Sequence, residues 1–240
     1  FGKPRVGHSR RNETASGGSL IFPTMRSPKY QFPSTGFYAI LDAGYVDADS
    51  WVQKGRELLE GGAAVLQIRA KNRPPQEVLS LAQLIEPFTK SFAVPLIIND
   101  HLEVARQIEG AGLHIGQDDI SPEVARWELG PDRFIGLSTH SQKQIMGALE
   151  WAAILDYFAV GPVFPTGTKP TYAPVGIPLV QFAAQQNPPI PFFCIGGVSR
   201  NNMHEVIAAG AKGLVAVSDP LLDPDTRQAT ASFVERIHLG

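Results

Sequence analysis

The amino-acid sequence predicts a single α/β domain folded as a closed (β/α)8 TIM barrel. The length of 240 residues is close to the roughly 250 that such a barrel needs. Eight short apolar runs alternate with longer segments of helical periodicity, and polar residues follow most of these runs. A doubly wound open sheet more often has about five to seven strands, so the barrel is the better interpretation.

The eight expected strands are short and rich in β-branched or aromatic residues. Most of them alternate little between apolar and polar side chains, which is typical of parallel strands covered on both faces. In chain order they are residues 37–41, 64–68, 95–99, 112–115, 134–138, 157–160, 192–195 and 214–217.

Several of the helices between these strands have recognisable ends. The pair Gly61-Gly62 is typical of residues that terminate a helix, here the first one. Ser121 followed by Pro122 predicts an N-cap and a first-turn proline. Ser199 predicts the start of a further helix, which ends at Gly210.

Composition excludes several classes of partner. Hydrophobic residues make up 43% of the chain, enough for a large core, and the net charge of −2 gives no basic field for nucleic acid or an anionic membrane. No apolar run approaches the roughly 20 residues of a membrane-spanning helix. The single cysteine, Cys194, excludes an intramolecular disulfide, so we expect a reducing, cytoplasmic location or at least a fold independent of cross-links. The sequence leaves open whether the protein forms a homo-oligomer.

Residues 1–35 differ from the rest of the chain. They are rich in Arg, Lys, Ser, Pro and Gly, and Glu13 is their only acidic residue. We expect a disordered basic extension, with the barrel domain at 36–240. The composition resembles an organelle-targeting peptide but has no clear amphipathic repeat, so we favour an upstream extension with a natural start near Met25.

The active site of a parallel barrel is built at the C-terminal ends of its strands, so polar residues in these positions are candidates. Gly196 and Gly197 follow the seventh strand and Ser218 follows the eighth, where many barrels bind phosphate. Glycines allow backbone N–H groups to approach a phosphate closely, although a tight turn would also explain the pair.

Three cations follow expected strands: Arg69, Lys71 and Lys169. If they face one mouth, they can bind a pair of phosphates, although each alone could be a solvated loop charge. Thr166 and Thr168 lie beside Lys169 in a loop rich in Pro, Gly and Thr, which resembles an anion clamp.

Two carboxylates, Asp100 and Asp119, follow adjacent strands near these cations. Oxygen ligands of this kind fit Mg2+, which retains water and substrate phosphate as its other ligands. Asp118 is also available, but it could equally cap the helix that begins at Ser121, so we favour Asp119.

Histidine and cysteine patterns add little. An ordered core residue is the more ordinary interpretation of His114, which lies within a strand, whereas His101 and His140 lie near the rim and their roles stay open. The sequence contains no zinc-type cluster, Walker loop or GxSxG motif.

Seven motifs in fixed order resemble those of thiamine-phosphate synthases, over about Phe37 to Val217. They are QIRAK (67–71), IIND (97–100), HIGQDD (114–119), GLSTH (136–140), GPVFPTGTK (161–169), CIGGVS (194–199) and VAVS (215–218). The resemblance implies the coupling of 4-amino-2-methyl-5-hydroxymethylpyrimidine diphosphate with 4-methyl-5-(2-phosphooxyethyl)thiazole. The products are thiamine phosphate and diphosphate, and diphosphate departs before the thiazole nitrogen captures the pyrimidine carbocation.

The resemblance also implies roles for individual residues. The pyrimidine diphosphate is contacted by Gln67, Arg69, Lys71, Asn99, Ser138 and Lys169. The thiazole phosphate is surrounded by Thr166, Thr168, Gly197, Val217 and Ser218. Asp100 and Asp119 match the Mg2+ ligands, and the residues expected to act in catalysis are Arg69, Lys71, Ser138 and Lys169. Both partners are therefore small molecules.

The sequence departs from the family pattern at two positions and leaves two alternative functions open. Ala70 and Gly167 stand where the family often has other residues, but neither position supplies an expected ligand. A thiazole tautomerase shares the barrel and the thiazole-phosphate site, yet proton transfer needs no diphosphate clamp, so the cations and Asp119 favour the synthase. A noncatalytic phosphate-ligand-binding barrel is the second alternative.

Overall fold

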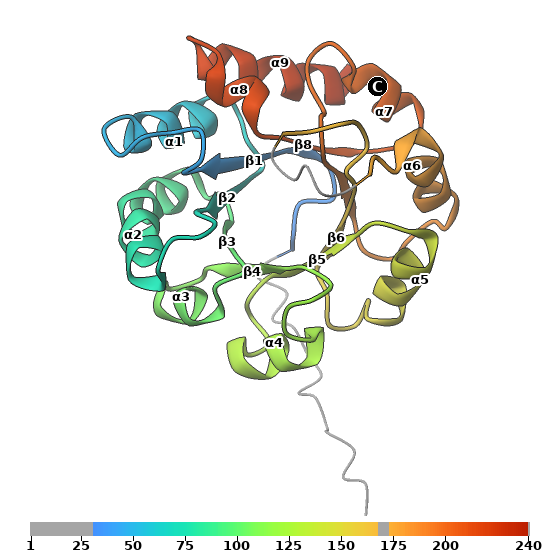
Figure 1. The fold of residues 1–240 in the computed structure, drawn as a ribbon, viewed down its shortest axis with the longest axis horizontal. Helices are drawn as coiled ribbons and strands as arrows, with labels where there is room; N and C mark the ends of the chain where they lie inside the picture. Colours follow the sequence, from blue (N-terminus) through green and yellow to red (C-terminus); the bar gives the residue numbers. More distant parts are fainter. Residues whose placement is uncertain (1–30, 168–172, 240) are drawn as a thin grey trace, which may run out of the picture.

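The structure, a computed structural model, describes residues 31–167 and 173–239, which form a closed barrel of eight parallel strands inside a ring of helices (Figure 1). The strands are β1 (Gly36–Asp42), β2 (Val65–Arg69), β3 (Leu96–Asn99), β4 (Gly112–Ile115), β5 (Ile135–Thr139), β6 (Tyr157–Val160), β7 (Phe192–Cys194) and β8 (Gly213–Ala216). The helices are α1 (Trp51–Glu60), α2 (Pro75–Phe92), α3 (Leu102–Gln107), α4 (Pro122–Leu129), α5 (Gln142–Glu150), α6 (Gly176–Gln185), α7 (Met203–Ala208), α8 (Ser218–Leu222) and α9 (Thr226–Leu239).

Each strand pairs in parallel with the strands before and after it in the sequence. The ring closes between β1 and β8, where Gly36 lies opposite Gly213 and Ala39 lies opposite Ala216. The predicted TIM barrel is confirmed, and each expected strand boundary lies within one residue of the observed one.

The strands are buried on both faces, which explains their weak alternation. Every residue of β1 is buried. On its outer side the ring of Phe37 stacks on Phe233 of α9 with ring centroids 4.7 Å apart. On its inner side the ring of Tyr38 lies 5.5 Å from that of Phe193 of β7, measured between centroids. One layer of apolar contacts therefore fills the barrel and another joins it to the helices.

The helix ends expected at Gly61 and Ser121 are confirmed. The first helix ends at Glu60 with Gly61 as its C-cap, and the side chain of Ser121 accepts a hydrogen bond from the backbone N–H of Val124 at 3.4 Å. The expected start at Ser199 is wrong, because α7 begins at Met203. Residues 200–202 form a turn in which the side chain of Asn202 accepts a hydrogen bond from the N–H of Ser199 at 2.8 Å.

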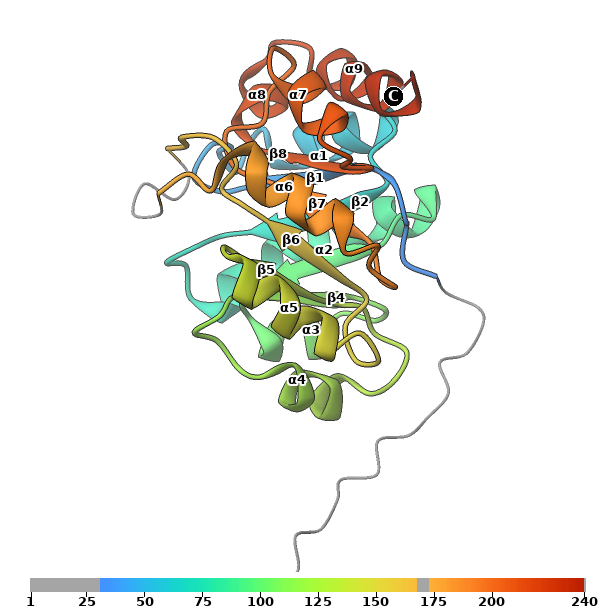
Figure 2. The same ribbon diagram turned by 90° about the vertical axis from the view of Figure 1, so that its right-hand side faces the viewer.

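The described end of the expected N-terminal extension packs against the barrel. Residues 31–35 run into β1, and Figure 2 shows them approaching the barrel from the end opposite the loop that follows β6. Phe32 is buried, with its ring stacked on Tyr157 and edge-on to Phe134 and Phe193. The expectation of disorder is therefore wrong for these five residues, because Phe32 fits among the aromatic rings of the barrel interior. Residues 1–30 lie outside the described part of the chain.

No helix in the described residues is long and apolar enough to cross a bilayer.

Candidate active site

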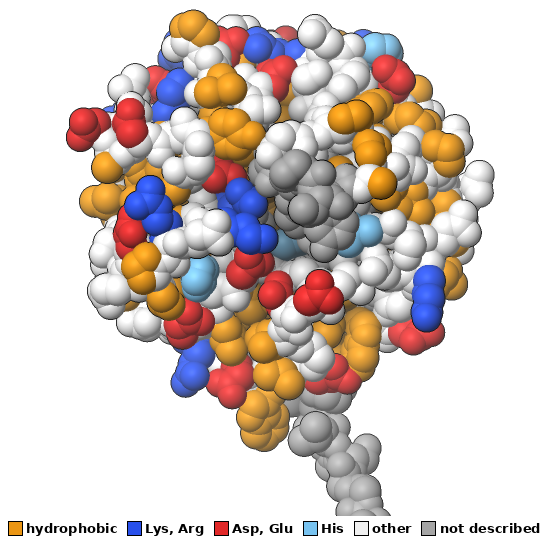
Figure 3. Space-filling model, in the orientation of Figure 1, with side chains coloured by type: hydrophobic (Ala, Val, Ile, Leu, Met, Phe, Trp, Pro, Cys, Tyr) orange, Lys and Arg blue, Asp and Glu red, His pale blue; other side chains and the backbone are white. Residues whose placement is uncertain are grey.

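A cavity of about 130 Å³ lies at the C-terminal ends of the strands, where the sequence places the active site. Its wall contains residues from all eight strands and from the segments that follow β5, β6, β7 and β8. Figure 3 looks onto this face, where acidic, basic and histidine side chains lie close together around the centre.

Eight of the expected substrate residues line the cavity. They are Gln67, Arg69, Asn99, Ser138, Thr166, Gly197, Val217 and Ser218. Three other expected residues are exposed and do not line it: Lys71, Asp100 and Asp119. Thr168 and Lys169 lie outside the described residues. The structure describes two of the expected cations, Arg69 and Lys71. Arg69 lines the cavity, whereas Lys71 lies on the outer loop after β2.

Arg69 is held by a buried carboxylate that was not among the expected site residues. Its Nη1 donates a hydrogen bond to Oδ2 of Asp42, the last residue of β1, and the two side chains are 10% and 2% exposed. The other carboxylate oxygen of Asp42 accepts from the N–H of Gly44 at 2.8 Å. A guanidinium carries five N–H donors, so this ion pair fixes Arg69 and leaves donors for an anionic ligand.

A chain of buried hydrogen bonds crosses the barrel beneath the cavity. Gln67 Nε2 donates to the hydroxyl of Tyr38 at 2.9 Å, and that hydroxyl lies 2.7 Å from the hydroxyl of Tyr157. The Tyr157 hydroxyl lies 3.0 Å from Nδ1 of His114, whose Nε2 lies 2.9 Å from Oγ of Ser138. Five residues from strands β1, β2, β4, β5 and β6 thus fix one another's polar atoms at the cavity wall.

Tyr38 and Tyr157, the two tyrosines in this series of hydrogen bonds, stay neutral. Burial raises the pKa of Tyr38, and the hydrogen bonds from Tyr157 and Gln67 lower it only in part. Burial also raises the pKa of Tyr157 well above its usual value. Hydroxyls can donate or accept, so this arrangement suits either neutral tautomer of His114.

The three histidines near the rim differ in their surroundings. His114 is buried, as the more ordinary interpretation of the sequence predicts, but it also lines the cavity. His140 lines the cavity too, with Nδ1 lying 2.5 Å from the carbonyl oxygen of Gly161. His101 does not line it, and its Nδ1 lies 3.1 Å from the carboxylate of Glu103.

Gly196 and Gly197 are required by the packing of two loops. Their φ angles are +98° and +63°, a region that favours glycine. A Cβ on Gly196 would lie 2.3 Å from Cα of Pro162, and one on Gly197 would lie 2.5 Å from the carbonyl oxygen of Pro165. The loop after β6 thus lies directly against the glycine pair, which explains the pair without a ligand, although both glycines also line the cavity.

Asp100 directly follows β3, and Asp119 lies in the loop after the neighbouring strand β4. The backbone N–H of Asp100 donates to the carbonyl oxygen of His114 in β4 at 3.0 Å, which ties the end of β3 to the strand before Asp119. Oδ2 of Asp119 accepts from the N–H of Gly116 at 2.6 Å, so the loop holds this carboxylate. Both residues are exposed, and carboxylate oxygens are ligands that Mg2+ prefers.

No cluster of three or more His, Cys, Asp or Glu side chains that could share a metal occurs in residues 31–167 and 173–239. A metal held by Asp100 and Asp119 would therefore take its remaining ligands from water and substrate, as Mg2+ commonly does.

Comparison with known proteins identifies the family. A family model described as thiamine monophosphate synthase matches residues 37–219. The chain belongs to this family. It is therefore an enzyme of the thiamine-phosphate synthase type, a transferase, and the match covers nearly the same residues as the seven motifs.

Individual relatives agree with this assignment. A thiamine-phosphate synthase of Dictyoglomus turgidum is 37% identical over 180 residues, which are 75% of this chain and 79% of that protein. One from Roseiflexus is 36% identical over 215 residues, which are 88% of this chain and 89% of that protein. The solved structure of thiamine phosphate pyrophosphorylase from Pyrococcus furiosus superposes with a TM-score of 0.76 at 28% identity, covering 86% of this chain and 96% of that one.

Proposed function

We propose that this chain is a thiamine-phosphate synthase that couples the pyrimidine diphosphate to the thiazole phosphate, releasing diphosphate. The observation that carries the proposal is the cavity itself, which brings together eight of the substrate residues implied by the motifs. Family membership supports the same reaction.

The side chains of the cavity suit a reaction in which a diphosphate leaves. The bond between the pyrimidine methylene carbon and the diphosphate oxygen breaks, and the electron pair departs with the diphosphate. Arg69, held in place by Asp42, is positioned to stabilise the charge that grows on the leaving group. The lone pair of the thiazole nitrogen then forms the new bond to the methylene carbon, so no protein nucleophile is needed.

The remainder of the wall holds and shields the reacting groups. Gln67 and Ser138 are fixed by the buried chain of hydrogen bonds, so their polar atoms are ordered before substrate binds. Ile40 and Phe193 make part of the wall apolar, which limits the access of water to the electron-poor methylene carbon.

Asp100 and Asp119 would hold Mg2+ beside this site. When bound, Mg2+ neutralises charge on the diphosphate oxygens and so assists their departure. The two carboxylates come from the ends of β3 and the loop after β4, next to the strands that carry Asn99 and His114.

The second substrate is assigned to the other side of the cavity. Thr166, Gly197, Val217 and Ser218 line it there, on the loops after β6, β7 and β8. We place the phosphate of the thiazole against these loops, as the family motifs imply. The roles of Lys71, Thr168 and Lys169 rest on the sequence.

Turnover of the two phosphorylated precursors tests the proposal directly. Wild-type protein with Mg2+ should form thiamine phosphate and diphosphate, and Lys169→Ala should lower the rate while leaving thiazole-phosphate affinity nearly intact. If the wild type isomerises a thiazole carboxylate but never couples the thiazole to the pyrimidine, the barrel is a tautomerase. If it binds the phosphates and does neither, it is a ligand-binding protein.

The cytoplasmic location and the oligomeric state stay predictions. Cys194 is a buried free thiol, so the described fold does not depend on a disulfide.

A further inference from the structure

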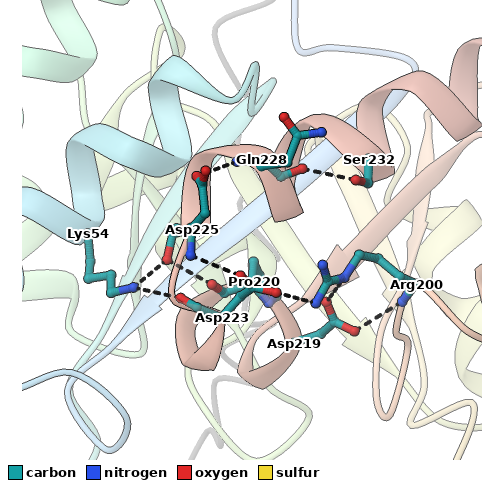
Figure 4. A network of polar contacts seen from close by, with 9 residues as sticks. Lys54, Arg200, Asp219, Pro220, Asp223, Asp225, Gln228 and Ser232 are labelled. Carbon is teal, nitrogen blue, oxygen red and sulfur yellow. Dashed lines mark hydrogen bonds and ion pairs between the residues drawn. The ribbon is translucent and has the colours of Figure 1, made fainter.

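One arginine joins the two loops to which the phosphate of the second substrate is assigned. Arg200 lies in the loop after β7, and its side chain reaches α8, which follows β8 (Figure 4). Nε of Arg200 donates to Oδ1 of Asp219 at 2.7 Å, and its backbone N–H donates to Oδ2 of the same carboxylate at 3.1 Å. Nη2 of Arg200 donates to Oδ2 of Asp223 at 2.7 Å. Both oxygens of Asp219 are thus engaged by one residue.

Asp219 places a negative charge in the wall of the cavity. It lines the cavity directly after Ser218, and its side chain is 15% exposed. A phosphate ester carries up to two negative charges at neutral pH, so an uncompensated carboxylate here would repel it. The wall therefore requires a compensating cation before it can accept such a ligand.

Asp223, one of the two carboxylates that contact Arg200, is fixed by further hydrogen bonds. The second oxygen of Asp223 accepts from the backbone N–H of Asp225 at 2.9 Å. Lys54 of α1 donates from Nζ to the carbonyl oxygen of Asp223 at 3.0 Å and to the hydroxyl of Thr226 at 2.6 Å. Figure 4 shows Lys54 reaching this segment from the opposite side to Arg200. Asp223, which orients the guanidinium, is therefore itself held by Asp225 and by Lys54 of α1.

The contact between Arg200 and Asp223 favours the charged form of both side chains. The hydrogen bond to Asp223 is the main cause of the raised pKa of Arg200, with further contributions from Asp219. The N–H of Asp225, followed by the bond from Arg200, lowers the pKa of Asp223.

We propose that Arg200 is a positioning residue for the second substrate, because it neutralises Asp219 and holds the loops after β7 and β8 together, so that a phosphate ester can bind between them. The inference rests on the proposed function, which assigns the phosphate to these loops. Arg200 does not itself need to contact the ligand, since both guanidinium edges described above are occupied by carboxylates.

This role differs from ordinary stabilisation. The side chain of Arg200 is 35% exposed and that of Asp223 is 24% exposed, and ion pairs near the surface contribute little to folding. A substitution should therefore change ligand affinity far more than the melting temperature. An effect on one substrate and not on the other would identify the subsite.

The experiment compares Arg200→Met, the double variant Arg200→Met with Asp219→Asn, and wild type. Arg200→Met should raise the KM of the thiazole phosphate about tenfold and leave the KM of the pyrimidine diphosphate within about twofold. The double variant should recover most of the loss, because it removes the uncompensated charge. Higher salt should reduce the defect of Arg200→Met by screening.

Arg106→Met is the matched control, because Arg106 and Glu128 form a 3.1 Å ion pair between α3 and α4, away from the cavity. It should leave both KM values unchanged. Equal effects of Arg200→Met on both substrates, no effect on either, or no recovery in the double variant would each overturn the proposal. If Arg200→Met does not fold, Arg200→Lys decides instead: it retains the charge and should keep the KM near that of wild type.

Failure of the proposed function is distinguishable from failure of this inference. Calorimetric titration with inorganic phosphate requires no turnover, and Arg200→Met should weaken phosphate binding even if the wild type couples no substrates. A wild type that turns over normally, alongside an Arg200→Met variant with unchanged phosphate affinity, would overturn the inference alone.

Discussion

The ring of Phe32 stacks on the ring of Tyr157, with centroids 4.3 Å apart and planes inclined by 5°. Phe32 precedes β1, whereas Tyr157 begins β6 and carries the hydroxyl that contacts both His114 and Tyr38. The segment before β1 thus packs against a residue of the buried hydrogen-bond series. Its removal should weaken the fixed orientation of the side chains at the cavity wall.

Phe32→Ala should lower the free energy of unfolding by about 2–4 kcal/mol, because it removes a ring that packs against three aromatic neighbours. Urea denaturation measures this loss. A chain that starts at Met25 retains Phe32 and should be as stable and active as the longer form, whereas one that starts at Gly36 should lose both properties. Equal stability of the two shortened chains would contradict this role.

Tyr157→Phe separates the hydroxyl from the ring. It preserves stacking on Phe32 but leaves Nδ1 of His114 without this partner, at a cost of about 1–2 kcal/mol in stability. Turnover should fall about tenfold or more, since the side chains at the cavity wall lose their fixed orientation. Phe32→Leu is the comparison: it should reduce stability with a smaller effect on turnover. A larger loss of turnover in Phe32→Leu than in Tyr157→Phe would show that the hydrogen bonds do not position the site.

Asp42→Asn should impair the enzyme because it leaves the buried guanidinium of Arg69 without its counter-charge. Removal of one partner of a buried ion pair typically costs about 3–5 kcal/mol. The KM for pyrimidine diphosphate should rise along with the loss of stability. Glu77→Gln provides the control, because the Arg73–Glu77 pair is exposed and should contribute less than about 1 kcal/mol. Similar effects of the two substitutions would count against a special role for Asp42.

The metal assignment is tested with three neighbouring carboxylates. Asp100→Ala and Asp119→Ala should each reduce turnover by several powers of ten without unfolding the barrel, since Mg2+ binding is lost. Asp118→Ala should leave activity close to wild type, because Asp118 is expected to be no ligand. The assay is a titration of turnover with Mg2+, followed by excess chelator. Full activity in chelator would refute the metal site.

The sequence was sufficient to predict the barrel and most of the rim. The strands are covered on both faces, so their apolar runs are continuous and easy to delimit, as with residues 112–115 and 157–160. Residues at the C-terminal ends of the strands lie near the mouth of a parallel barrel, so Arg69, Asn99 and Ser138 could be placed from their position alone.

Residues near the N-terminal ends of the strands could not be assigned in this way. Tyr38 and Tyr157 have the composition of core residues, and only the three-dimensional pairing of distant strands shows that their hydroxyls meet. Arg126 on α4 could not be assigned from sequence either. It is 7% exposed because its guanidinium donates to Asp156 and to the carbonyl oxygen of Ile154, which are distant in sequence. A charged residue on a helix is ordinarily expected at the surface.

The aromatic layer above Phe32 gives the described barrel a closed end. Tyr38, Tyr157 and Phe193 are at most 2% exposed, so ligands have no path between them and the opposite end of the barrel. Two substrates must then enter, and two products must depart, through the mouth at the strand C-termini.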